Sequence, residues 1–75
     1  MSEEEPAAEL RAQLAEVEKD LENARRNAAD IRSGVGEAED PADRGALIQA
    51  ADEQDNLADQ LVIRRENLLH RISQT

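Results

Sequence analysis

A run of apolar residues spaced alternately four and three apart dominates the first half of this 75-residue sequence. Such spacing places the apolar side chains on one stripe of a helix, and it is the heptad pattern of coiled coils. The stripe consists of Leu10, Leu14, Val17, Leu21, Ala24, Ala28 and Ile31. No Gly or Pro interrupts it, and Pro6 suits the first turn of a helix, so the pattern predicts a helix over residues 6–33.

Two signals mark a break in the middle of the chain. Gly34 and Gly36 are expected to end the first helix, which gives a loop over residues 34–40. Asp40 and Pro41 then form a helix start, with Asp as the cap and Pro at the first helical position. The second helix is predicted over residues 41–73.

The second helix carries a less regular apolar seam, because Gln54 and Arg65 fall in it. The seam runs through Leu47, Ala51, Gln54, Ala58, Leu61, Arg65, Leu68 and Ile72. Two long helices joined by a short loop pack antiparallel. The predicted fold is therefore all-α: an antiparallel two-helix coiled-coil hairpin over residues 6–75, preceded by a disordered acidic tail over residues 1–5.

Five large apolar residues lie beside the second seam, which gives that helix a broader apolar surface than one partner helix covers. They are Ile48, Leu57, Val62, Ile63 and Leu69. We expect this flank to give the protein a tendency toward a weak homodimer, a four-helix bundle, whose stability the sequence leaves open.

Composition excludes several classes of function. The chain has no Cys, which excludes disulfides and thiolate metal sites, and its single histidine, His70, has no ligand-type neighbour at metal-binding spacing. No catalytic constellation is visible, so we expect no enzyme activity, no metal and no cofactor. The longest apolar run is three residues, and the N-terminus lacks an apolar signal segment. A cytoplasmic protein is the expectation.

The net charge of −9 points to protein partners. It argues against binding nucleic acid or an anionic membrane, both of which require basic surfaces. The charge is also uneven: residues 37–59 hold eight acids and only Arg44, a net of −7, whereas residues 60–75 carry a net of +2. The loop end of the hairpin is thus acidic and suits a basic cleft. The alternative is that these charges only solvate a thin rod.

The stretch Asp40-Pro41-Ala42-Asp43-Arg44 resembles the coiled-coil tip of the TraR/DksA family of RNA polymerase regulators, which carry Asp-Pro-x-Asp-Arg-Ala between two helices. The Arg-rich segment 63–72 is similar to the close of their second helix. A weaker likeness to the Gre transcript-cleavage factors lies in residues 50–54. The sequence departs from the TraR/DksA pattern at Gly45, where Ala is usual, and in having no cysteines for a zinc finger.

The resemblance implies a small transcription modulator that enters the secondary channel of RNA polymerase. The implied partner-binding tip comprises Asp40, Asp43, Arg44 and Gly45. The residues alone leave open a second interpretation, in which Asp40 and Asp43 are helix caps only. In that case the protein is a structural or adaptor hairpin that binds a partner helix, or itself, through the apolar flank.

Overall fold

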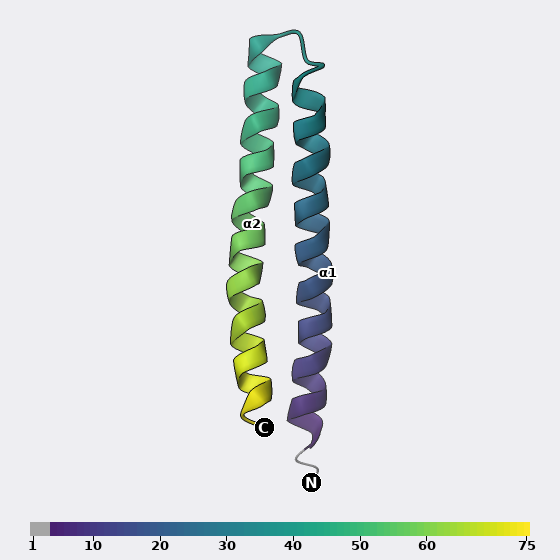
Figure 1. Ribbon diagram of the computed structural model, residues 1–75, viewed down its shortest axis with the longest axis vertical. Helices are drawn as coiled ribbons and strands as arrows, with labels where there is room; N and C mark the ends of the chain where they lie inside the picture. The colour runs from purple at the N-terminus through teal and green to yellow at the C-terminus, as the bar shows by residue number, and fades with distance from the viewer. Residues whose placement is uncertain (1–3) are drawn as a thin grey trace.

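The computed structural model describes residues 4–75 as two long antiparallel helices, α1 (Glu4–Val35) and α2 (Pro41–Ser73), joined by one short loop (Figure 1). This confirms the predicted all-α helical hairpin. The molecule is a rod of 61 × 14 × 14 Å. The loop forms one end of the rod, while α1 begins and α2 ends at the other (Figure 1).

The ends of α1 differ from the sequence prediction. The helix begins at Glu4, so residues 4 and 5 of the predicted tail are helical, and residues 1–3 lie outside the described residues. It also continues through Gly34 to Val35. Neither Gly34 nor Gly36 adopts a positive φ, so the helix ends in a tightened turn instead of a left-handed glycine cap. In this turn the amide of Glu37 donates to the carbonyl of Gly34 at 3.2 Å.

The start of α2 follows from its cap. The peptide before Pro41 is extended at Asp40 (φ −81°, ψ 125°), and the Asp40 side chain accepts a hydrogen bond from the amide of Ala42. Pro41 occupies the first turn, where a missing N–H leaves no partner unsatisfied. The observed bounds of α2, Pro41–Ser73, match the predicted helix over residues 41–73.

The core is the seam between the two helices. Its buried side chains are Leu10, Val17, Leu21, Ala24, Ala28, Ala51, Ala58 and Leu68. The other seam residues are half-buried, namely Leu14, Ile31, Leu47, Gln54, Leu61, Arg65 and Ile72. Every position on the two heptad stripes thus faces the opposite helix to some degree.

The two halves of the seam are packed differently. Toward the termini, Leu10, Val17 and Leu68 form a cluster with Leu14, Leu61 and Ile72 packed against it. Toward the loop the buried residues are mostly alanines, including Ala51, which is fully buried. Alanine layers bury less apolar area per residue than leucine layers. The loop half therefore receives less hydrophobic stabilisation than the leucine-rich half. It is also the half that carries the acidic end.

Neither described helix is long and apolar enough to cross a membrane.

Candidate functional site

The loop end brings the sequence-predicted tip residues together, and the structure separates their roles. The Asp40 carboxylate accepts the Ala42 amide at 2.9 Å, and its carbonyl accepts the Arg44 amide at 3.0 Å. Asp40 is therefore engaged in starting α2. This is the local hydrogen bonding expected of an N-cap, in which the side chain satisfies an amide that the helix leaves free.

Asp43, in contrast, has no local role of this kind. It lies exposed in the first turn of α2, and its carboxylate makes no hydrogen bond or ion pair with any described residue. The positive end of the α2 dipole favours an acid at this position. Asp43 therefore presents an unneutralised charge to solvent.

Arg44 and Gly45 complete the tip. The Arg44 guanidinium folds back and donates to the carbonyl of Glu39 at 2.9 Å, which ties the loop to the helix start. Gly45 lies in the first part of α2, and a Cβ built there would meet no atom within 4 Å. Packing does not require a glycine at this position, so alanine would fit.

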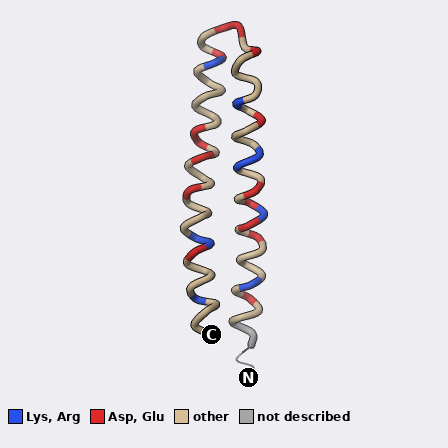
Figure 2. The backbone as a smooth tube through the Cα atoms, viewed as in Figure 1, with Lys and Arg blue, Asp and Glu red and all other residues tan. Residues whose placement is uncertain are grey.

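Acidic residues are concentrated at the loop end of the backbone (Figure 2). Glu37, Glu39, Asp40 and Asp43 are all exposed there. Arg44 is the one cation among residues 33–51, and its guanidinium is bound to a backbone carbonyl. The loop end is therefore a concentrated negative charge on a narrow support.

A second group of acids is partly neutralised. Arg32 of α1 donates to Asp55 of α2 through both terminal nitrogens and reaches Asp52 at 3.4 Å. The hydrogen bond from Arg32 lowers the pKa of the Asp55 carboxyl, and the same contact raises the pKa of Arg32. Sequence reasoning did not predict this pair. The signal that could have found the pair is that Arg32 and Asp55 both lie one position after the seam in their heptads.

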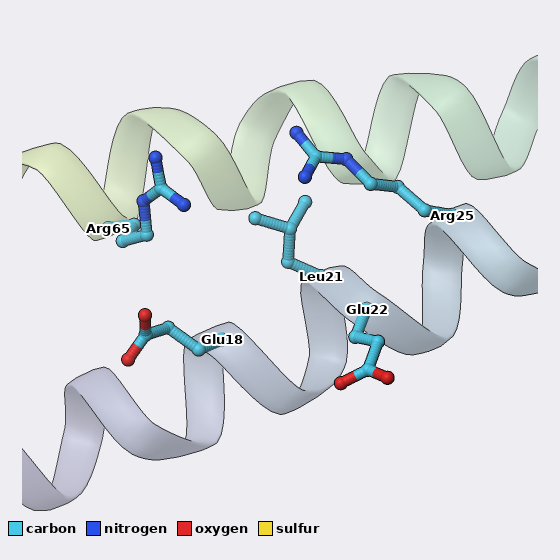
Figure 3. A pocket seen from close by; sticks show the side chains of 5 residues that line it. All are labelled: Glu18, Leu21, Glu22, Arg25 and Arg65. Atoms are coloured by element: carbon cyan, nitrogen blue, oxygen red, sulfur yellow. The ribbon is translucent and has the colours of Figure 1, made fainter.

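One shallow pocket lies between the helices near mid-rod, lined by Glu18, Leu21, Glu22, Arg25 and Arg65 (Figure 3). The two arginine side chains lie on either side of Leu21, and the two glutamates project from α1 (Figure 3). Arg65 occupies a seam position, and its buried Nε has no hydrogen-bond partner. The pocket lining thus combines two carboxylates, two guanidinium groups and one apolar side chain.

The five predicted flank residues do not share one face. Ile48, Leu57, Ile63 and Leu69 are 43–67% exposed, whereas Val62 is half-buried against the cluster of Leu21, Ala24 and Ala58. Ile48, Val62 and Leu69 are separated by multiples of seven residues, so they form one stripe beside the seam. By the same spacing Leu57 lies on the opposite side of the seam, and Ile63 points away from α1.

Among the described residues, no three His, Cys, Asp or Glu side chains are grouped so that they could hold a metal ion. His70 is exposed in the last turns of α2, where its Nε2 lies 3.1 Å from the side-chain nitrogen of Gln74.

No family model matches this chain, and comparisons with curated proteins and with solved structures give no match either.

Proposed function

We propose that the protein is a small transcription modulator that binds RNA polymerase by inserting its acidic loop end into the secondary channel. The exposed, unpaired Asp43 at the end of a 14 Å wide rod is the observation that carries the proposal. The resemblance of residues 40–44 to the TraR/DksA tip supplies the partner. In this role Asp43 meets basic groups of the channel, and Asp40 holds the helix start that positions it.

The shape and charge of the hairpin support insertion into a basic channel. The tip lies at the opposite end of the rod from the start of α1 and the end of α2, so nothing in the described chain obstructs it (Figure 1). A localised negative potential accelerates encounter with a basic cleft, and salt weakens that attraction. Binding is therefore expected to fall as ionic strength rises.

The test is a binding titration of the labelled protein against the RNA polymerase core of its host, at low and physiological salt. Asp43→Asn is compared with Asp59→Asn, which removes the same charge from an exposed site in the middle of α2. The proposal predicts saturable binding that Asp43→Asn weakens strongly and Asp59→Asn weakens little. Absence of binding, or equal weakening by the two variants, would overturn it.

Asp40 needs a different pair of substitutions because it is also the cap. Asn caps helices about as well as Asp, so Asp40→Asn removes charge while keeping the hydrogen bond to Ala42. Asp40→Ala removes both. If Asp40 acts only as a positioning residue, Asp40→Asn binds like the wild type, whereas Asp40→Ala loses both stability and binding.

A structural or adaptor role is the second candidate, and the exposed apolar residues of α2 favour it. In this role a helix of a partner protein covers part of α2, and the tip is not involved. In that case, replacing Leu57, Ile63 or Leu69 with Gln impairs function, while Asp43→Asn does not.

A further inference from the structure

The mid-rod pocket contains an arginine that the fold does not require. Arg65 occupies a seam position of α2, between Leu61 and Leu68, where an apolar side chain would pack against α1. Its Nε is buried and has no hydrogen-bond partner. A buried polar atom without a partner lowers stability. Natural proteins concentrate such costs at functional sites, so an arginine at this position indicates a role in binding.

The rest of the pocket comes from one face of α1, because its lining residues there are spaced three or four apart. They are Glu18, Leu21, Glu22 and Arg25. Glu22 is already engaged, since its carboxylate accepts a hydrogen bond from Arg26 at 2.8 Å. Glu18, Arg25 and Arg65 form no ion pair with any described residue. Two guanidinium groups and one carboxylate are therefore left for a ligand.

We propose that this pocket binds a small zwitterion, an α-amino acid with an aliphatic side chain. Arg25 and Arg65 lie on either side of Leu21 (Figure 3), and the carboxylate of the ligand accepts hydrogen bonds from their guanidinium groups. The ammonium group of the ligand pairs with Glu18. Its aliphatic side chain lies over Leu21 and the apolar stems of the two arginines.

Charge favours a zwitterion over a simple anion. The chain has a net charge of −9, which repels any ligand that is itself negative overall. An amino acid has no net charge at neutral pH, so this repulsion is absent. It also uses Glu18 as well as the two arginines, whereas a simple anion would bring a second negative charge close to that carboxylate.

The size of the pocket suits a ligand of this kind. Its volume of about 310 Å³ lies at the lower end of the range for small-molecule sites. Glu18 and Arg25 are exposed, so water competes for their charges, and a shallow site gains little apolar contact. Weak binding is therefore expected, with a Kd of about 1 mM.

The test is an NMR titration of the isotopically labelled protein with leucine and with two analogues that each lack one charge. Isocaproate lacks the ammonium group, and isopentylamine lacks the carboxylate. The Nε–H signals of Arg25 and Arg65 report on the pocket directly. Leucine should bind about fivefold or more tightly than either analogue, because only leucine meets both kinds of charge. No response to leucine at about 50 mM, or equal affinity for leucine and isocaproate, would overturn the proposal.

Three variants separate the roles of the lining residues, and circular dichroism establishes that each keeps its helices. Arg65→Leu should weaken leucine binding about tenfold or more, because one of the two carboxylate contacts is lost. Arg64→Leu is the matched control, since it removes the same charge from the exposed neighbouring position and should leave binding unchanged. Glu18→Gln should remove the preference for leucine over isocaproate. Equal weakening by Arg64→Leu, or an unchanged preference in Glu18→Gln, contradicts the assignment.

Thermal unfolding gives an independent readout, because a ligand held by both α1 and α2 stabilises the folded hairpin. Leucine at about ten times its Kd should raise the unfolding midpoint of the wild type and of Arg64→Leu. It should leave the midpoint of Arg65→Leu unchanged. A rise of the same size in Arg65→Leu would be a general effect of the solute and would overturn the proposal.

Discussion

Arg32 on α1 and Asp55 on α2, 23 residues apart in sequence, form the ion pair that joins the loop halves of the two helices. This pair lies where the seam consists mainly of alanines, and it reaches Asp52 as well. Its position suggests that charge compensates for weak apolar packing near the tip. Stability in this half should therefore respond to salt and pH more than in the leucine half.

Arg32→Gln should lower the thermal unfolding midpoint, because it removes every contact of the inter-helix ion pair. Arg26→Gln is the control, since Arg26 pairs only within α1, with Glu22 at 2.8 Å. Thermal melts followed by circular dichroism should show the larger decrease for Arg32→Gln at low salt. The difference should shrink at high salt, where exposed ion pairs are screened. Equal decreases would contradict a special role for Arg32.

Acidification should remove the contribution of Asp55. Its pKa is lowered from an ordinary value of 3.8 by the hydrogen bond from Arg32. The stabilisation is complete above 3.8 and disappears as pH falls through the lower pKa of the folded protein. Asp55→Asn lacks this contribution at neutral pH, so the midpoints of wild type and variant should converge in acid. Urea unfolding across a series of pH values measures the difference, and a constant gap would refute the linkage.

Gly45→Ala should stabilise the protein by about 0.5–1 kcal/mol, because alanine has the higher helix propensity and meets no neighbour at this position. Urea unfolding gives the free energy directly. Ala46→Gly, at the exposed neighbouring position, should lower it by a similar amount. A destabilising Gly45→Ala would mean that an unseen contact occupies the space beside residue 45.

Arg65→Leu should raise the free energy of unfolding. Arg65 sits in the seam with an unpartnered buried Nε, and Leu would place an apolar side chain there, between Leu61 and Leu68 along the stripe. Removing an unsatisfied polar atom relieves a penalty of about 1–3 kcal/mol before any packing gain. Arg64→Leu, at an exposed site, is the control and should change stability little. A loss of stability in Arg65→Leu would show that the guanidinium makes contacts worth more than this penalty.

Local sequence rules predicted the features that depend on one helix at a time. The Asp40–Pro41 start fixes α2 because cap and proline act within a single turn. The heptad spacing likewise identifies which side of each helix faces its partner. The end of α1 was placed too early, because Gly34 can keep helical dihedrals when no left-handed cap forms.

The register between the two helices and the roles of individual side chains were not predicted. The bond from Arg32 to Asp55 requires the register of the two helices, which neither stripe alone specifies. The distinction between Asp40 and Asp43 needed the side-chain hydrogen bond to Ala42. The five flank residues were grouped by being off the seam, although heptad position separates Leu57 and Ile63 from the other three.

The start of α1 and the end of α2 lie at the same end of the rod (Figure 1), and this determines how the hairpin responds to mechanical force. Tension applied between the termini would unzip the helices one layer at a time, because the load falls first on the layer nearest the ends. That layer contains Leu10 and Leu68, part of the leucine-rich half. The most apolar packing thus lies where separation would begin, and the alanine layers near the tip would bear tension only after it had failed.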